Sequence, residues 1–450
     1  MDTLTQRIAR FTAGLTHEAL PEAVREKCKV SLLHNLGVAL AGGPLLQAPR
    51  RYAQMLGEAG PGASARLLLG GDRASAETAA FVNASLMHAR AQDDVYFAGL
   101  THAGAILSPA VLAVAEQLEA SGQEVVTALA AGYEAVGAIS QDVARLTTPR
   151  GFRASGIYGG FGAAAGVARL LGLDATATAH ALGLAASSAS GTNQTWVSGT
   201  QEWQIQIGLA ARNGLMAARL VQAGATAAPD ALEGPAGFYR AFLGHCDGLA
   251  GVGSDLGQHW RCLDVTYKPY AVCAILQAPV AQAIALAQAN DIDPGQIAAI
   301  RLSLNPAEAA YPGTDARGPF VDIGATLMSA QFCLAVALSQ RVVRGVDLQR
   351  LHDPVLQPLI HCAEVIPDAS LATRQFVLDI ELHDGSRLRY ASQHIGQPFN
   401  WDRQGVMDNL RAMSSEIPLP QPRLERLFDT VLHAERHSAR DIVSSAVVAA

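Results

Sequence analysis

Two histidines and two adjacent acids lie within one short stretch of the sequence, "LMHARAQDDVYFAGLTHAG". These residues are His88, Asp93, Asp94 and His102. Only 16% of the chain is charged, and adjacent carboxylates repel each other, so burial would raise the pKa of at least one of them unless a cation is near. Histidines and carboxylates within mutual reach are the groups that general acid–base catalysis uses. The stretch therefore predicts a site, with a solvent-exposed turn that carries two acids as the alternative.

The elements around this stretch are predicted to be two helices joined by a loop. "ASAETAAFVNASLMHARAQ" predicts one helix, so Asp93 and Asp94 would fall at its carboxyl end, where an anion is disfavoured by about 0.3–1 kcal/mol. Locally unfavourable placements of this kind are typical of functional sites. His102 precedes a second predicted helix, whose amino terminus attracts anions. We expect a base, an acid and an anion-binding helix end in one loop.

A lysine-containing segment, "DVTYKPYAVCA", lies where the sequence pattern changes. Its Lys268 stands among aromatic residues, and such a lysine can be desolvated enough to act as a base or to bind a carboxylate. The alternative is an exposed lysine in a connection. Tyr270 of the same segment is a candidate substrate-binding residue. The histidines and acids match no metal-binding H-x-x-x-H or C-x-x-C spacing, so we predict no metal.

The glycine-rich segment "SGIYGGFGAAAG" could suggest a dinucleotide-binding loop. No strand pattern precedes it, and no strand that ends in an acid follows about 20 residues later. Close packing between helices is the better interpretation of these glycines.

The elements that must position these residues are helical up to about Arg261. Pro21 opens a predicted helix that Gly42 and Gly43 end, and other segments rich in alanine and glycine suggest a compact bundle. After Tyr267 the pattern changes: "AAIRLSLN" and "QFVLDIELHDGSRLRYAS" alternate as strands, with a tight turn at Asp384-Gly385. Helices are expected between these strands, at 323–340 and 348–362. We predict a mainly α protein with a large all-helical domain, residues 1–266 and 401–450, and a smaller α+β lid domain, residues 267–400.

Composition limits the classes of function. The formal net charge is −7 and no run of lysine or arginine is dense enough for a phosphate-binding face, so a nucleic-acid partner is not expected. The amino-terminal pattern shows no signal peptide, and the longest weakly polar run, 155–168, is shorter than the roughly 18 residues that a membrane span needs. Six cysteines without a C-x-x-C pair favour free thiols. We expect a cytoplasmic protein without a membrane partner.

Together these motifs resemble the 2-methylcitrate dehydratase (MmgE/PrpD) family, which also includes cis-aconitate decarboxylase and iminodisuccinate epimerase. The resemblance covers nearly the whole chain. The segments that carry it are "FVNASLMHARAQDD" with "THAG", "RGFRASGIYGGFGAAAGVARLLGL", "ALGLAASSASG", "LVQAGATAAPDALEGPAGF", "YKPYAVCA" and "YPGTDARGPF".

The resemblance implies a homodimer with a cofactor-free site at the junction of the two domains, which binds a small di- or tricarboxylate. The family's acidic pair, its following histidine and its junction lysine correspond to Asp93, Asp94, His102 and Lys268. Some positions differ from the family pattern: Arg153, Gln206 and Gln277 stand where relatives commonly have histidine, and Trp203 where lyase members commonly have lysine. These replacements leave the substrate and the reaction type open.

Our leading hypothesis is a 2-methylcitrate dehydratase-like lyase that abstracts a proton α to a carboxylate. His102 or Lys268 would be the base, Asp93 or Asp94 would orient a partner or act as an acid, and Arg153 and Lys268 would bind substrate carboxylates. His88, Gln206 and Tyr270 complete the predicted substrate-binding set.

The first alternative is an epimerase of an iminodisuccinate-like dicarboxylate, which needs bases on two faces. Lys268 with Tyr158 or His102 would supply them. The second alternative is a catalytically silent family member that acts as a binding protein, which would have no reason to keep the polar residues together.

Overall fold

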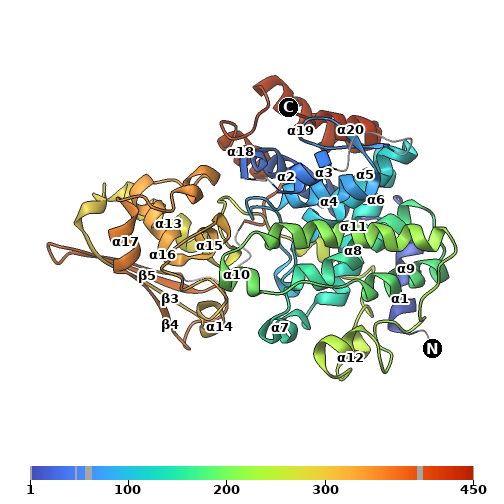
Figure 1. Ribbon diagram of the computed structural model, residues 1–450, viewed down its shortest axis with the longest axis horizontal. Coiled ribbons are helices and arrows are strands. Elements are labelled where there is room, and N and C mark those ends of the chain that lie inside the picture. Colours follow the sequence, from blue (N-terminus) through green and yellow to red (C-terminus); the bar gives the residue numbers. More distant parts are fainter. Residues whose placement is uncertain (1–2, 46–47, 56–62, 393–398, 449–450) are drawn as a thin grey trace.

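The larger part of the computed structural model is a bundle of helices, and the smaller part packs helices against a sheet at one end of it (Figure 1). The structure describes residues 3–45, 48–55, 63–392 and 399–448. The chain is therefore mainly α with a smaller α+β part, which confirms the predicted fold class. The exact boundaries at residues 266 and 400 stay a prediction.

The helices of the larger part come from both ends of the chain. They are α1 (Leu4–Gly14), α2 (Glu22–Ala41), α3 (Ala48–Met55), α4 (Ala76–Met87), α5 (Ala103–Leu118), α6 (Gly122–Ser140), α7 (Ala144–Thr147), α8 (Ala154–Leu170), α9 (Ala175–Ser187), α10 (Gln194–Ser198), α11 (Glu202–Gln222), α12 (Phe238–Leu243), α18 (Arg403–Ala412), α19 (Gln421–Leu432) and α20 (Ala439–Ser445). This part also contains a two-stranded antiparallel pair, β1 (Ala65–Arg66) and β2 (Arg73–Ala74), that the sequence pattern did not predict.

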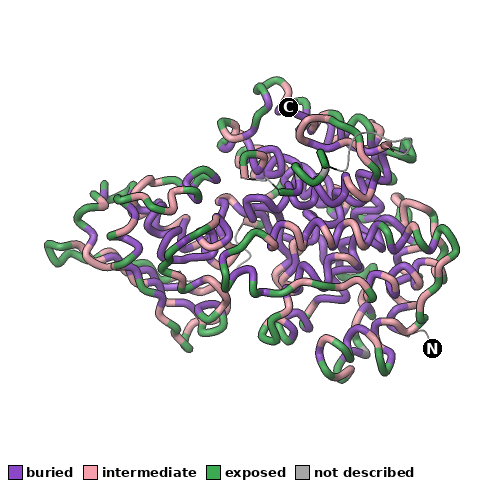
Figure 2. Tube along the Cα trace, viewed as in Figure 1, coloured by how far each residue is buried: buried purple, intermediate pink, exposed green. Residues whose placement is uncertain are grey.

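Small residues let the central helices approach closely. A Cβ at Gly132 of α6 would lie 2.7 Å from the carbonyl oxygen of Gly162 in α8. A Cβ at Gly214 of α11 would lie 2.4 Å from the carbonyl oxygen of Gly160, also in α8. Alanine is too large for such crossings, so Gly132 and Gly214 allow α6 and α11 to pack closely on the glycine-rich helix α8. Buried residues fill this bundle (Figure 2).

The smaller part is built on a four-stranded sheet in the order β4-β3-β5-β6. β3 (Ile297–Leu304) pairs parallel with β4 (Ala363–Pro367) and antiparallel with β5 (Phe376–Leu382), which pairs antiparallel with β6 (Arg387–Ala391). Its helices are α13 (Gln277–Ala289), α14 (Pro306–Ala309), α15 (Ile323–Met328), α16 (Ala330–Gln340) and α17 (Leu356–Cys362). Ile300, Leu302 and Leu304 of β3 are buried, as their alternation predicts.

The two parts have separate apolar cores that meet at a junction. One core is made by the helical bundle and the other by the sheet with its helices, but Ala91, Trp196 and Trp203 from the helical part belong to the second core. The chain crosses between the two parts twice, and near these crossings the backbone N–H of Tyr267 donates to the carbonyl oxygen of Phe399 at 3.0 Å. Within the described ranges, every helix is too short or too polar to cross a membrane.

Candidate active site

The acidic pair lies in an irregular segment beyond α4, and the prediction that α4 extends to it was wrong. α4 ends at Met87 with His88 as its carboxyl cap, and Ala91 then takes a left-handed conformation with a φ of 50°. Asp93 and Asp94 are completely buried. A solvent-exposed turn is excluded, because both carboxylates lie inside the protein.

A contact between distant segments places Lys268 beside this pair. Val95 and Thr266 form an antiparallel bridge, with N–H···O distances of 2.9 and 3.0 Å. Side chains two residues away on each antiparallel strand share a face, so Lys268 comes opposite Asp93. Lys268 is 1% exposed and its Nζ donates to the carbonyl oxygen of Ala91. The alternative of an exposed lysine in a connection is therefore wrong.

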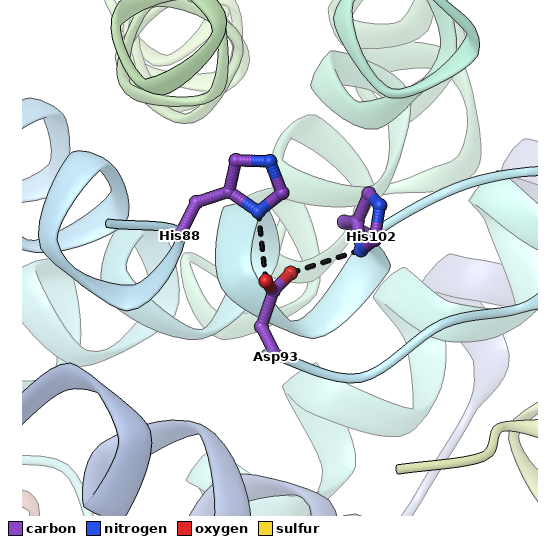
Figure 3. Close-up of side chains that lie close together, drawn as sticks. All are labelled: His88, Asp93 and His102. Atoms are coloured by element: carbon purple, nitrogen blue, oxygen red, sulfur yellow. Dashed lines mark hydrogen bonds and ion pairs between the residues drawn. The ribbon is translucent and has the colours of Figure 1, made fainter. Parts of the chain in front are cut away.

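One carboxylate bridges two histidines (Figure 3). The Oδ1 atom of Asp93 lies 2.7 Å from Nδ1 of His88, and its Oδ2 atom lies 3.1 Å from Nδ1 of His102. Burial alone would raise the pKa of Asp93, but His88, His102 and Lys268 together hold it well below its ordinary value. Asp93 therefore stays ionised.

The neighbours of each ring fix where its proton lies. The guanidinium of Arg153 can only donate, and its Nη2 lies 2.6 Å from Nε2 of His88. His88 therefore accepts at Nε2 and donates from Nδ1 to Asp93. Burial lowers the pKa of His88 to about 3, which keeps the ring neutral.

His102 has the same tautomer as His88, but the two Nε2 atoms have different surroundings. Its Nδ1 faces the carboxylate of Asp93 and, at 3.0 Å, the backbone carbonyl of Asp94, so Nδ1 carries the proton. Among the described residues Nε2 has no hydrogen-bond partner, and the side chain is 18% exposed. Burial and then the charge of Lys268, whose Nζ is 3.5 Å from Nδ1, lower the pKa of His102. A neutral imidazole with a free nitrogen beside a carboxylate has the chemistry that a general base needs.

Asp94 points away from this cluster, into the helical bundle. Its carboxylate accepts hydrogen bonds from Tyr133 Oη at 2.6 Å and from the backbone N–H of Gly104 at 3.0 Å. It thus occupies the amino terminus of α5, the helix end where the sequence predicted anion binding. Burial, partly offset by the hydrogen bond from Tyr133 and reinforced by Asp93, raises the pKa of Asp94 to about 6. Asp94 therefore anchors the loop and is not placed to touch a substrate.

A cavity of about 670 Å³ lies between the two parts of the chain. The helical side contributes His88, His102 and Arg153, and Lys268 of the junction lies with them. Arg153 is buried, precedes α8 and also donates to Gln206 at 3.2 Å and to the backbone carbonyl of Trp203. The structure thus brings five predicted site residues to one place: His88, Asp93, His102, Arg153 and Lys268.

Three other predicted residues do not line this cavity. Tyr158 is buried with its hydroxyl 3.2 Å from that of Thr147, and burial raises its pKa to about 12, so it is not placed to act as a base. Gln206 contacts Arg153 and can only position it. Tyr270 is half-buried and its backbone bonds to the side chain of Gln277.

Trp203, where the resemblance implies a lysine in lyase members, contributes packing beside the site. Its ring packs edge-on against His88, with centroids 5.1 Å apart, and it lies outside the cavity lining. Only its backbone carbonyl meets Arg153. The deep cations of the site are therefore Arg153 and Lys268.

Sequence reasoning missed the opposite wall of the cavity. That wall includes Glu308, Tyr311, Met328 and Arg374 from the α+β part, and Trp196 extends it. Tyr311 opens the segment "YPGTDARGPF", which carried the resemblance, so that motif was a usable signal. The others lie on short helices and loops whose spacing indicates no site.

His88, Asp93 and His102 could in principle hold a metal ion, because one donor atom from each lies within 4.8 Å of the others. However, Nε2 of His88 already accepts from Arg153, and both Nδ1 atoms face Asp93. Two buried cations, Arg153 and Lys268, also disfavour a divalent ion here. The donor set fits proton transfer better than metal binding.

This chain is similar to known proteins over most of its length. The family described as MmgE/PrpD N-terminal domain matches residues 6–247. Two cis-aconitate decarboxylases of Aspergillus terreus are 23% and 26% identical, each over 96% of this chain and 93% of its own length. Human cis-aconitate decarboxylase is 32% identical over 36% of this chain and 34% of its own length.

Proposed function

Because this chain belongs to the MmgE/PrpD family, we propose that it is a lyase that moves a proton at the carbon next to a carboxylate of a small di- or tricarboxylate. The observation that carries the proposal concerns His102, which lines the cavity. Its Nε2 has no hydrogen-bond partner among the residues that the structure describes, while Asp93 holds the other ring nitrogen. Full-length similarity to cis-aconitate decarboxylases supports a lyase-like function.

In this proposal each residue has one task. His102 removes the proton through Nε2, and Asp93 stabilises the imidazolium that forms. Arg153 and Lys268 bind the substrate carboxylate and stabilise the negative charge that develops on it when the proton leaves. His88 orients Asp93 through Nδ1 and holds the guanidinium of Arg153 in place through Nε2.

The reaction is completed by breaking a bond at the adjacent carbon. In a dehydratase, the proton that His102 removed leaves with the β-hydroxyl group as water, and an alkene remains. In a decarboxylase no α-proton is removed: the bond to one carboxylate breaks, carbon dioxide leaves, and His102, protonated from solvent, donates one proton to the carbanion that remains. The name of the similar Aspergillus proteins supports the second outcome, and the family resemblance supports both.

Epimerisation has less support from the geometry. It requires acid–base groups on two opposite faces of the substrate. His102 and Lys268 lie 3.5 Å apart on the same wall, and Tyr158 does not line the cavity. A silent binding protein also has less support, because the polar residues are assembled with defined proton positions.

Isotope exchange tests the proposal directly. We expect the protein, incubated with di- and tricarboxylates in deuterated water, to give a new alkene signal or carbon dioxide. Deuterium gain without net conversion would instead indicate epimerisation. His102→Asn should lower turnover by about 10²- to 10⁴-fold, whereas the exposed His352→Asn should leave it unchanged.

Turnover by His102→Asn at the wild-type rate would contradict the proposal.

We further propose that the enzyme needs no cofactor or metal and is a cytoplasmic homodimer. Activity lost on chelation and restored by a divalent ion would contradict the first statement, and a monomer mass in solution would contradict the second.

A further inference from the structure

The cavity has a second cationic end, formed by Arg145 of α7 and Arg374 of the loop before β5. At the inner end Arg153 and Lys268 are buried beside the histidines. At the outer end Arg145 is exposed and Arg374 half-buried. The cavity therefore runs from a buried pair of cations towards a more exposed pair.

The backbone of Arg374 is held in an unusual conformation. Its φ is 69°, in the left-handed region that residues other than glycine rarely adopt. Its N–H donates to both carboxylate oxygens of Glu308, each at 3.0 Å. Strained residues that are fixed by several contacts are concentrated at binding sites. Here the conformation directs the side chain, whose guanidinium carbon lies 5.1 Å from the ring centre of Phe97, a cavity residue.

At this outer end the carboxylates have hydrogen-bond partners, whereas the guanidiniums have none within the described ranges. Glu308 is engaged by the backbone of Arg374, and Asp264 accepts from His259 at 2.9 Å. In contrast, the buried Nη1 of Arg374 has no hydrogen-bond partner in the part of the chain that the structure describes. Arg145 likewise makes no ion pair with a described residue. Burial lowers the pKa of Arg374, the charge of Glu308 raises it, and the charge of Arg145 lowers it further. Glu308 is thus a neighbouring anion for both guanidiniums, but neither guanidinium forms an ion pair with a carboxylate among the described residues.

The surface between the two ends is largely apolar. It includes Phe97, Leu100, Trp196, Ile275 and Met328. A volume of about 670 Å³ is in the range of pockets that bind drug-sized molecules, roughly 300–1,000 Å³. A compact tricarboxylate would leave much of this apolar surface uncovered.

We propose that Arg145 and Arg374 form a second anion subsite, so that the substrate carries its reacting carboxylate at one end and another anionic group at the other, joined by an apolar chain. The second group is a carboxylate or a phosphate, since a guanidinium binds either. Arg145 belongs to the helical part and Arg374 to the α+β part, so the bound anion would hold the two parts together. This inference rests on the proposed function for the identity of the reacting end.

Binding measurements with defined probes test the subsite without the unknown substrate. Dissociation constants would be measured by calorimetry for saturated linear dicarboxylates of four to eight carbons. Monocarboxylates and ω-phosphonocarboxylates of the same lengths complete the set. We expect one of the longer dianions to bind most tightly and to exceed the matched monocarboxylate by about tenfold or more.

Arg374→Gln and Arg145→Gln should each remove most of that advantage and leave monocarboxylate binding within about twofold. The exposed Arg317→Gln, which removes the same charge outside the cavity lining, should keep it. Preference for the carboxylate or for the phosphonate probes identifies the second group.

Equal binding of mono- and dianions, or an advantage that survives both substitutions, would overturn the subsite. His102→Asn keeps these two proposals apart. If it abolishes the formation of alkene or carbon dioxide while the arginine variants change nothing, only the subsite is wrong. If it leaves this turnover intact, the proposed function is wrong, whatever the arginine variants do.

Discussion

Asp93 and Asp94 are adjacent in the chain but direct their carboxylates into different surroundings. Asp93 faces two imidazoles and Lys268, whereas Asp94 faces a tyrosine hydroxyl and a helix amino terminus. The pKa of the first is lowered and that of the second is raised to about 6. Opposite shifts in neighbouring acids indicate separate roles.

The charge of Lys268 tunes the base as well as binding the substrate. Since this charge lowers the pKa of His102, we expect Lys268→Met to raise that pKa. His102 must be neutral to accept a proton, so the acidic limb of the kcat/KM profile should move to higher pH. The measurement is the pH profile of the variant with any substrate that it still turns over.

Arg317→Gln, which loses an exposed charge, is the control and should keep the limb in place. A higher KM without any movement of the acidic limb would mean that Lys268 only binds the substrate. A shift to lower pH would contradict the electrostatic argument.

At the scale of elements, α5 depends on Asp94 for the partner of its second backbone N–H. The raised pKa has a definite sign in stability. Asp94 has a pKa of about 6 in the folded protein against an ordinary pKa of 3.8 for an aspartate, so the folded state binds the extra proton between these values. Its contribution is fully present below pH 3.8 and is lost as pH rises through 6.

Asp94→Asn removes this titration. Relative to the variant, the wild type should lose about 3 kcal/mol of unfolding free energy between pH 4 and pH 7, because two pKa units correspond to about that amount. Urea unfolding of both proteins at several pH values measures the difference. A constant difference across this range would show that Asp94 does not titrate between these pH values.

The helix crossings give a second prediction at this scale. Gly214→Ala would place a Cβ 2.4 Å from a backbone oxygen of α8, so α11 and α8 must move apart. We expect a loss of about 1–3 kcal/mol in unfolding free energy. Gly14→Ala adds the same atom where nothing lies within 4 Å and should be neutral or gain up to about 1 kcal/mol. Equal effects of both substitutions would argue against close packing at the crossing.

Sequence patterns predicted the elements whose signals are local. α2 begins after Pro21 and ends before Gly42, and β3, β5 and the turn at Asp384-Gly385 lie where alternation placed them. The predicted helix at 323–340 is instead two helices, because Ser329 is extended and caps α16 by accepting from the N–H of Phe332.

The path of the loop that carries the site could not be predicted in the same way. The loop between α4 and α5 is fixed by the bridge between Val95 and Thr266, which are far apart in sequence. The direction of each carboxylate follows from that contact. The pattern therefore identified Asp93, His102 and Lys268 by type, but the opposite roles of Asp93 and Asp94 required the structure.

At the scale of the whole molecule, Trp203 joins the two parts. It belongs to α11 of the helical part, yet its side chain is fully buried in the core of the α+β part, 5.5 Å from the ring of Trp196. Trp203→Lys would introduce the residue type that the family resemblance implies at this position, but it would remove this packing and bury an ammonium group. We expect a loss of about 3–5 kcal/mol in unfolding free energy, the range for removing a buried tryptophan.

Trp203→Phe keeps an aromatic ring and should cost less than Trp203→Lys in the same urea titration. We expect no gain of activity from the lysine, because Arg153 and the backbone carbonyl of Trp203 already fill the space beside His88. A stable and more active lysine variant would show that the site retains room for the family arrangement.

The hydrogen bond between Tyr267 and Phe399 makes the α+β part a topological insertion, because its two ends meet while helices α18 to α20 return to the bundle. Such a cassette can be exchanged by recombination without cutting the helical scaffold. An exchange would replace Lys268, Glu308, Tyr311 and Arg374 together and leave His88, Asp93 and His102 in place. Substrate preference would therefore diversify in evolution while the two histidines and the carboxylate between them are inherited unchanged.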